Sequence, residues 1–482
     1  MSLRDYLAQI SIPVYVIVSL FAISSWIDIN GLFVESPQLV YALPEGWSLF
    51  SYLAVLIQVA NLGPILYMIL RKLFPERVKE WPIVYAIIGM GATACFLLAF
   101  FWQETTVING KSHSTALFVL VSFLALVDCT SSVVYLPYMG QYKPQYMTAF
   151  YIGEGLSGMI PGFLGLIQGV QSDPRCLNKT VVKTNEMTGE NTTVHRIMAE
   201  YPPPLFSVQV FFFFLFAMLL LSGVSFTLLH FHPFCKKELV ASVYSYNLPD
   251  VGVKRSEEKN GRTEESSKRS RLALTTLSSD DYKLTSPYRE PENGTTSMNG
   301  KNEKRFKLST AQFVYVLFLA GLLNALLNGV LPSTNSYTCL PYGSLAFTLA
   351  IRLSAVANPL TCFFALFMRT KSLIVVGIVA LFATGLSAWQ LYLAVMSPYP
   401  PLKNTVAGTA LVITSHVLNT ICIIHVNVSN AFIMNAHGGR HSLLWLGGAT
   451  QIGSCIGAIV TFVFVNVLRV FHSEPPCPGM SY

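Results

Sequence analysis

Long apolar segments, separated by short polar ones, constrain the fold of this chain more than any other feature. A helix that crosses a bilayer needs about 20 mostly apolar residues. Backbone amide groups in lipid must form hydrogen bonds within their own segment, so each segment is expected to be helical. The sequence therefore predicts an all-α membrane protein with eleven transmembrane helices in a lipid bilayer. The predicted spans are 12–34, 49–70, 83–102, 115–136, 147–170, 205–230, 311–331, 343–368, 372–396, 405–428 and 443–470.

Charged residues make up only 12% of the chain, whereas a soluble domain carries about 25%. Residues 236–308 hold a dense mixture of charges, so the apolar segments are poorer still. The net charge of +7 comes from loop Lys and Arg, and no basic stripe with interleaved aromatic residues is present. We therefore expect no nucleic-acid partner.

The positive charges of the loops predict how the helices are oriented. Arg71, Lys72, Arg77 and Lys79 follow the second span, and Lys or Arg also follows the fourth, eighth and tenth spans. The alternate loops, counting the short ones, hold only Lys111 and Lys403. The more basic loops are expected in the cytoplasm. The N-terminus is then cytoplasmic and the C-terminus extracellular.

The long loop 171–204 is predicted to be extracellular, and it holds two glycosylation sequons. These begin at Asn178 and Asn191, which are expected to carry glycans. Asn293 begins a third sequon on the predicted cytoplasmic side and is expected to stay unmodified.

Composition divides the chain into three parts. Residues 1–234 are expected to form a six-helix transmembrane bundle, and residues 311–482 a five-helix bundle. Residues 235–310 are polar and rich in Ser and Lys, so they bury too little apolar surface to fold and are interpreted as a disordered cytoplasmic linker. The first apolar segment has no cleavage-site pattern and is interpreted as a retained span.

The two bundles share short strings at a nearly constant offset. The matched pairs are Asn30-Gly31 with Asn328-Gly329, 298 residues apart, Leu43-Pro-Glu-Gly46 with Leu340-Pro-Tyr-Gly343, 297 apart, and Ala60-Asn61 with Ala357-Asn358, 297 apart. The first pair lies near the predicted ends of the first and seventh spans. This pattern predicts a duplicated 6+5 bundle with a parallel repeat, as in major-facilitator transporters, whose sites lie near the midplane between the halves.

Polar side chains within the apolar segments are the candidate solute ligands. A charge at the centre of a span costs roughly 2.5–3.5 kcal/mol on insertion scales, so such a group faces a cavity or a partner. The four repeat-related Asn residues are interpreted as lining a cavity, whereas any single buried Asn or Ser serves equally well to join helices. The candidates are Asp28, Asn30, Glu35, Glu45, Gln58, Asn61, Asp128, Ser131, Ser132, Glu154, Asn324, Asn328, Arg352, Asn358 and Gln451.

Two further patterns concern packing and charge. Glycines at three- and four-residue spacing in the fifth span, and Gly453 and Gly457 in the eleventh, are expected to pack helices closely. Arg352 has Asp128 or Glu154 as candidate partners in a structural ion pair.

No catalytic motif is present. The chain has no Walker, GxSxG or HExxH pattern. Its nine cysteines form no CxxC pair, and His437 and His441 fall in a predicted loop. We expect neither an enzyme nor a metal site nor a bound cofactor.

Several strings resemble a known family. They are Trp26-Ile-Asp-Ile-Asn30-Gly-Leu-Phe-Val-Glu35-Ser-Pro37, Leu43-Pro-Glu-Gly-Trp-Ser-Leu49, Ala125-Leu-Val-Asp-Cys-Thr-Ser-Ser132, Gly153-Glu-Gly-Leu-Ser-Gly158, Asn328-Gly-Val-Leu-Pro-Ser333, Tyr337-Thr-Cys-Leu-Pro-Tyr-Gly343 and Ala357-Asn-Pro-Leu360. Together they are similar to the vertebrate-type riboflavin transporters of solute carrier family 52, across both halves and most loops except 235–310.

The resemblance implies an eleven-span plasma-membrane carrier that takes up riboflavin without sodium, with proton stimulation in some members. It also implies a fold related to the major-facilitator and equilibrative nucleoside carriers. Trp26, Asn30, Glu35 and Glu45 match family positions that matter for function.

The chain departs from the family pattern at several places. Tyr399 stands in Ser-Pro-Tyr-Pro where the family has Cys, so the resemblance leaves Cys477 either free or paired elsewhere, with Cys176 as the outer candidate. Phe33 stands where the family has Trp, and Ser36 where it has Leu. Arg352 replaces a small or apolar residue.

Riboflavin chemistry suits these residues. Its isoalloxazine ring is flat, aromatic and edged with carbonyl and NH groups, so a pocket needs an aromatic face and amides that donate and accept. Asn supplies both functions, and Trp26, Phe33 or Tyr337 could stack on the ring. The alternatives are a facilitative carrier of another flat polar solute, such as a nucleoside, and a non-transporting membrane receptor. A monomer is expected.

Overall fold

The computed structural model describes residues 11–74, 77–143, 145–169, 174–184, 191–239, 308–367, 370, 372–475 and 477. The N-terminal half contains α2 (Ile12–Ala22), η1 (Ile23–Ser25), α3 (Ile27–Ala42), η2 (Gly46–Ser48), α4 (Leu49–Ala60), α5 (Leu62–Leu73), α6 (Glu80–Phe101), α7 (Thr115–Met139), α8 (Tyr146–Gln168), α9 (Val208–Phe231) and α10 (Pro233–Lys236). The C-terminal half contains α13 (Thr310–Ala325), η3 (Leu326–Val330), α14 (Leu331–Cys339), η4 (Leu340–Tyr342), α15 (Ser344–Phe367), α16 (Leu373–Val395), α17 (Val406–Phe462) and η5 (Val463–Val467).

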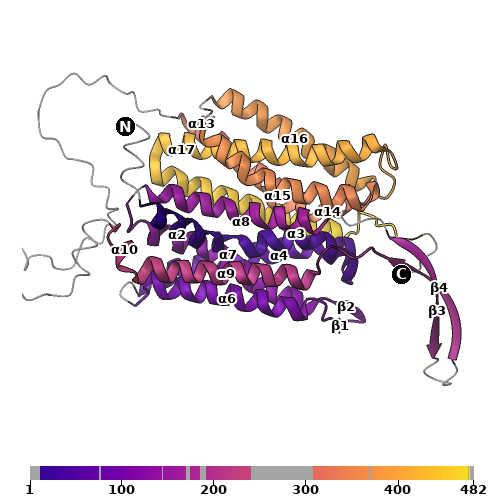
Figure 1. Ribbon diagram of the computed structural model, residues 1–482. Coiled ribbons are helices and arrows are strands. Elements are labelled where there is room, and N and C mark those ends of the chain that lie inside the picture. Colours follow the sequence, from indigo (N-terminus) through magenta and orange to yellow (C-terminus); the bar gives the residue numbers. More distant parts are fainter. Residues whose placement is uncertain are drawn as a thin grey trace, which may run out of the picture. The chain divides into compact units, whose positions relative to one another are not determined.

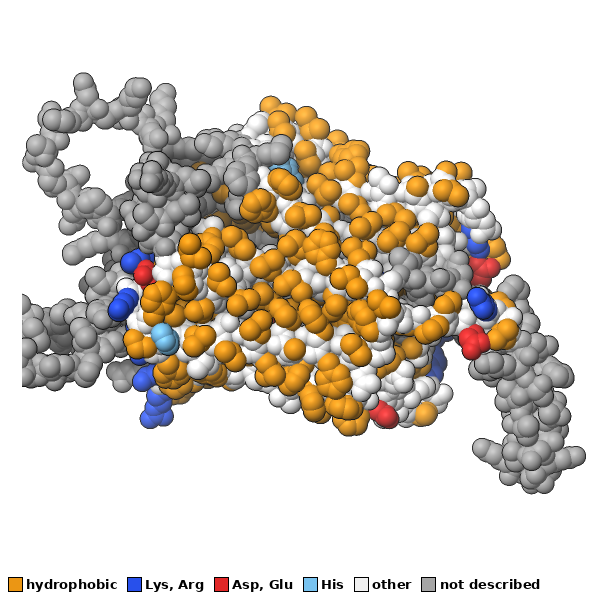
Figure 2. All heavy atoms as spheres, in the orientation of Figure 1, with side chains coloured by type: hydrophobic (Ala, Val, Ile, Leu, Met, Phe, Trp, Pro, Cys, Tyr) orange, Lys and Arg blue, Asp and Glu red, His pale blue; other side chains and the backbone are white. Residues whose placement is uncertain are grey.

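These helices include the eleven predicted spans. Among the described residues, ten helices are long and apolar enough to cross a membrane, and an eleventh span is formed by two helices bent by 56° at Trp26. On the face drawn in Figure 2, hydrophobic side chains cover the middle of the helical bundle and charged ones gather toward its two ends. The predicted all-α membrane fold with eleven spans is confirmed.

The last two spans belong to a single assigned helix, α17, which turns back on itself (Figure 1). Asn324 forms hydrogen bonds with both Asn427 and Ser454 of this helix. In a straight helix with a rise of 1.5 Å per residue, those two residues would lie about 40 Å apart. The tenth span is therefore Val406–His437 and the eleventh Ser442–Val467.

Three predicted spans were too short. The first runs from Ile12 to Ala42, the seventh from Thr310 to Tyr342 and the tenth from Val406 to His437. Polar residues such as Asn30 were interpreted as span ends, but here they lie within helices. Their side chains face other protein groups rather than lipid, so the helices continue past them.

The two halves contact one another as a duplicated bundle would. The repeat equates α3 with α14 and α4 with α15, and the structure contains the exchanged contacts α3 with α15 and α14 with α4. In the same way α8 packs on α15, while the second arm of α17 packs on α4. Gly46 and Gly343, which the repeat aligns, both have positive φ angles, of 52° and 102°.

The two ends of the helical bundle carry different segments of the chain. The hairpin end carries the hairpins β1 (Thr106–Ile108) with β2 (Lys111–His113) and β3 (Arg175–Thr184) with β4 (Asn191–Glu200). The opposite end carries the short helix α10 (Figure 1).

Buried apolar residues divide according to these two ends. One cluster joins both halves and includes Leu32 and Phe50 together with Phe347. Toward the opposite end, one cluster is built from the N-terminal half, around Phe21 and Tyr138, and another from the C-terminal half. The halves therefore share a core near the hairpin end and have separate cores near the opposite end.

Glycines allow close helix contacts, as predicted. A Cβ atom added to Gly162 of α8 would lie 2.8 Å from Val356 of α15, and one added to Gly457 would lie 2.3 Å from the Ala325 carbonyl oxygen. Both distances are too short for a side chain. Small residues at these positions therefore bring α8 against α15 and the second arm of α17 against α13.

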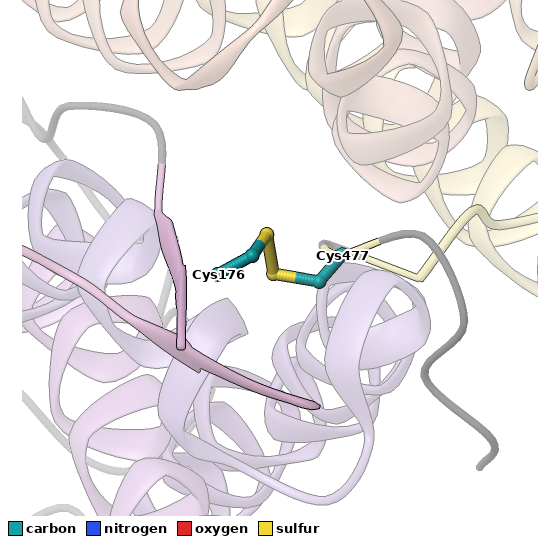
Figure 3. Close-up of a disulfide and its surroundings, with 2 residues drawn as sticks. All are labelled: Cys176 and Cys477. Carbon is teal, nitrogen blue, oxygen red and sulfur yellow. A yellow bond between two sulfur atoms is a disulfide. The ribbon is translucent and has the colours of Figure 1, made fainter. Parts of the chain in front are cut away.

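A disulfide joins the two halves at the hairpin end. Cys176 in β3 is bonded to Cys477 near the C-terminus (Figure 3). The sequence left Cys477 either free or paired with another cysteine, Cys176 being the candidate. The structure contains the Cys176 pairing.

The first residues of the predicted linker belong to the folded bundle. Residues 235–239 pack on the bundle, because Cys235 is buried, Glu238 forms an ion pair with Lys143 at 2.8 Å and Leu239 pairs with Tyr142. Residues 240–307, including Asn293, lie outside the described residues.

Candidate solute-binding site

The first span of each half has irregular backbone. The first span breaks at Trp26, a half-buried residue with φ −147° and ψ 10°. The seventh span contains a π-helical segment, η3, which includes Asn328. Transporter sites are often built on such interrupted helices, and π segments occur frequently at functional positions.

Asn30 and Asn328 make equivalent contacts in the two halves. The Asn30 side-chain nitrogen lies 3.5 Å from the Ser157 hydroxyl of the fifth span. The Asn328 side-chain nitrogen donates to the Ser454 hydroxyl of the eleventh span at 3.1 Å. Ser454 follows Ser157 by 297 residues, the offset of the repeat. The duplication therefore extends to the polar contacts inside the membrane.

The C-terminal half adds more amides around Asn328. The Asn324 side-chain nitrogen donates to the Asn427 side-chain oxygen at 3.1 Å, and the Asn324 side-chain oxygen lies 3.4 Å from the Asn328 side-chain nitrogen. The Ser454 hydroxyl also reaches the backbone oxygen of Asn324, at 3.3 Å. Asn324 is buried, whereas Asn328 is exposed in this structure. Asn328 is thus the exposed amide of a cluster whose other amide on this helix, Asn324, is buried and hydrogen-bonded.

Asn30 lies where three helices of the two halves meet. A Cβ atom built on Gly158 of α8 would be 3.4 Å from the Asn30 nitrogen and 3.8 Å from the Ala355 backbone oxygen of α15. One helical turn along α3, the half-buried Phe33 ring stacks on Phe50 with centroids 6.0 Å apart. The Asn30 side therefore combines an amide with aromatic rings.

Glu35 is fully buried and takes part in a chain of contacts across the halves. Its carboxylate accepts a hydrogen bond from the Gln168 side chain at 2.9 Å. The Gln168 oxygen in turn accepts from Arg352 at 2.6 Å, and Arg352 also donates to the Gly169 carbonyl at 2.6 Å. The proposed ion pair of Arg352 with Asp128 or Glu154 was therefore wrong. Its partners are a neutral amide and a helix C-terminus.

Asp28 and Asp128 form a separate buried pair in the N-terminal half. Both are fully buried, and their carboxyl groups contact one another. One Asp28 oxygen accepts from the Ile29 backbone N–H at 2.9 Å. The other Asp28 oxygen and both Asp128 oxygens have no hydrogen-bond donor among the described residues.

The Glu45 carboxylate contacts the residues that precede α7. It accepts from the Ser114 backbone N–H at 2.8 Å and from the Ser114 hydroxyl at 2.6 Å, and lies 3.4 Å from His113. Ser114 is the residue before α7, so the negative charge sits at the N-terminus of that helix, where it is favourable. These contacts account for Glu45 without a solute.

Four more of the candidates have local partners. The Asn61 nitrogen donates to Gln58 at 3.2 Å, the Ser132 hydroxyl reaches the Asp128 backbone oxygen, and Cys362 lies 3.9 Å from the exposed Asn358. Glu154 precedes Gly155, whose Cβ position is 3.6 Å from Pro359 of α15. Glu154 itself is close enough to Cys362 of α15 to interact with it electrostatically, so it lies at the boundary between the halves.

The sequence indicated the candidate residues but not the residues that form hydrogen bonds with them. Ser157, Ser454, Gln168 and Asn427 were not singled out. The 297-residue offset between Ser157 and Ser454 would have identified that pair. Nothing in the spacing identifies Gln168, because its contacts with Glu35 and Arg352 depend on how three helices pack. Within the described residues, no three His, Cys, Asp or Glu side chains gather in a metal-binding arrangement.

Comparisons with known proteins agree with the family resemblance. Residues 10–473 match the family model of solute carrier family 52, riboflavin transporter. The chain is 38% identical to riboflavin transporter 2 of Salmo salar over 467 residues, covering 96% of this chain and 98% of that protein. It is 34% identical to solute carrier family 52 member 3 of Homo sapiens, again over 96% and 98%. The structure of the nucleoside transporter NupG aligns with a TM-score of 0.44, at 12% identity over 96% of this chain and 91% of that one. The chain belongs to solute carrier family 52, the riboflavin transporter family.

Proposed function

We propose that this protein carries riboflavin into cells across the plasma membrane by alternating access. The observation that carries the proposal is the equivalence of the contacts of Asn30 with Ser157 and of Asn328 with Ser454, one in each half of a duplicated bundle. Such a pair of polar groups suits one solute held between two moving halves. Full-length similarity to proteins named as riboflavin transporters supports the identity of that solute.

The side chains suit a flat, neutral, hydrogen-bonding molecule. Asn30 and Asn328 each offer a donor and an acceptor, which match the carbonyl and NH edge of isoalloxazine. Trp26 and Phe33 are half-buried and leave part of each ring free to stack on it. Glu154, at the boundary between the halves, can accept from the ribityl hydroxyl groups. Asn61 and Gln58 at the end of α4, Ser132 of α7 and Asn358 of α15 are secondary candidates.

The orientation follows from loop charge. The basic loops lie at the opposite end, so we place that end and the N-terminus in the cytoplasm, and the hairpin end and the C-terminus outside. The shared core at the hairpin end then supports an inward-facing state in this structure. We propose a monomer, because one chain supplies both halves of the site.

Uptake of radiolabelled riboflavin into cells that express the chain tests the proposal. We expect saturable uptake above that of cells with empty vector, inhibited by unlabelled riboflavin and little affected by adenosine or uridine. Inhibition by nucleosides in place of riboflavin would favour the alternative solute class. Surface binding without accumulation would favour a receptor. Replacing sodium by choline and varying the external pH in the same assay tests sodium independence and proton stimulation.

A further inference from the structure

A buried arginine bridges the two halves near the hairpin end. Arg352 belongs to α15 of the C-terminal half and has no exposed surface. Its two terminal nitrogens donate to the Gln168 side-chain oxygen and to the Gly169 backbone oxygen, each at 2.6 Å. Both acceptors belong to the end of α8 in the N-terminal half. Separation of the halves at this end must therefore break both hydrogen bonds.

The acceptors suit a cation although neither carries a charge. Gln168 is the last residue of α8, so the guanidinium group sits at the negative end of that helix dipole. The Gln168 amide is held from both sides, because its nitrogen donates to Glu35 at 2.9 Å while its oxygen accepts from Arg352. A carboxylate, an amide and a guanidinium group thus form one continuous chain. Hydrogen bonds to charged groups are the strong ones, and a buried ion needs such partners.

Arg352 packs closely against α8. A Cβ atom on Gly165 would lie only 2.9 Å from the Arg352 Nε atom. A second contact between the halves lies further toward the hairpin end, where the Tyr41 and Ser344 hydroxyl groups are 2.8 Å apart. Arg352 therefore belongs to a closely packed layer between the halves.

We propose that Arg352 is the latch of the gate at the hairpin end, held by Gln168 and Gly169 when this end is closed and released when it opens. The inference rests on the proposed alternating access. The latch forms its hydrogen bonds only when the hairpin end is closed. It therefore stabilises the closed state relative to the open one and raises the closed population. Opening exposes the arginine to water, so the charge does not block the cycle.

The test measures opening at the hairpin end with a reporter thiol. Thr348 lies one turn before Arg352 on α15, is fully buried, and has a hydroxyl without a hydrogen-bond partner among the described residues. Thr348→Cys in purified protein in nanodiscs is treated with a maleimide. Mass spectrometry of the peptide that contains residue 348 then gives the labelling rate, independently of the native cysteines.

We expect slow labelling of Thr348→Cys alone. Adding Arg352→Met should speed labelling roughly ten- to hundredfold, the effect of losing hydrogen bonds to a charged group. Gln168→Ala should act in the same direction and replaces Arg352→Met if that variant does not fold. Arg352→Lys, which keeps the charge without the two-pronged geometry, should fall between.

Asn419→Ala is the matched control. Asn419 is buried and donates to Ser387 at 2.9 Å, but both residues belong to the C-terminal half. Its loss should leave labelling of residue 348 unchanged. Equal labelling with and without Arg352, or equal acceleration by Asn419→Ala, would overturn the latch. Failure of riboflavin uptake would instead overturn the proposed substrate, since the labelling assay contains no riboflavin.

Discussion

Amide side chains make many of the polar contacts inside this bundle. An amide both donates and accepts without carrying charge, so it can be satisfied in a low-dielectric interior at less cost than an ion. Asn324 shows this, because its side chain and backbone contact Asn328, Asn427 and Ser454. Asn30 and Asn328 differ from it, since each has only part of its capacity used. These two are the residues that we expect to meet the solute.

Asn30→Ala and Asn328→Ala should each weaken riboflavin uptake through affinity. An unsatisfied polar partner costs about 1–3 kcal/mol, which corresponds to a half-saturation raised roughly fivefold to 150-fold. Concentration-dependent uptake, normalised to surface expression, measures it. Asn419→Ala removes a buried amide within one half and should leave the half-saturation unchanged. Unchanged half-saturation in both variants at residues 30 and 328 would exclude them from the site.

Asp128→Asn should stabilise the protein. The Asp28 and Asp128 carboxyl groups contact one another, and three of their four oxygens have no donor among the described residues. An amide at residue 128 supplies a missing donor. Each kcal/mol gained raises the melting temperature by roughly 2–4 °C. Asp128→Ala offers no donor, leaves a cavity and should lower the melting temperature. Thermal unfolding in detergent compares the two, and equal destabilisation by Asn and Ala would contradict the explanation.

At the scale of helices, the number of spans was predictable and their ends were not. Apolar segments of about 20 residues are required wherever helices cross lipid, so eleven could be counted from the sequence. The bend at Trp26 and the continuation of α3 to Ala42 could not, because they depend on what the polar side chains face. Arg352 illustrates the same limit. Charge alone suggested Asp128 or Glu154, whereas packing gives it Gln168, which lies 184 residues away.

The β3–β4 hairpin offers a test of orientation. Asn178 lies in β3 and Asn191 in β4, and both begin sequons. Expressed in a eukaryotic cell, Asn178→Gln and Asn191→Gln should each remove one glycan, and the double variant should run like glycosidase-treated protein. Asn293→Gln is the control and should leave the gel mobility unchanged. Glycosidase-sensitive mass that persists in the double variant would contradict the placement of the hairpin end outside the cell.

At the scale of the whole molecule, the duplication explains why both the family and the region of the candidate site could be predicted from the sequence. Strings repeated at 297–298 residues appear as exchanged helix contacts and as paired Asn–Ser contacts. The roles of the site residues and the form of 240–307 stay predictions. For the linker, we expect that deletion of about residues 250–300 leaves uptake largely intact, because such a composition buries little.

The Cys176–Cys477 disulfide closes residues 176–477 into a covalent ring, with a sequence separation of 301 between the two cysteines. A single protease cut between residues 240 and 307 should therefore leave one species on a non-reducing gel and two on a reducing gel. A Cys477→Ser variant should separate into two species without reductant. Two species from the cut native chain before reduction would show that the disulfide had not formed.

This ring changes what the peptide connection between the halves has to do. After a cut, the disulfide still keeps each half at a high effective concentration near the other, so the halves remain partners without a continuous backbone. Peptide continuity and assembly are then separate requirements. In this chain, an uncut segment 240–307 is therefore not needed to keep the halves together, because the disulfide at the far end of the bundle does so.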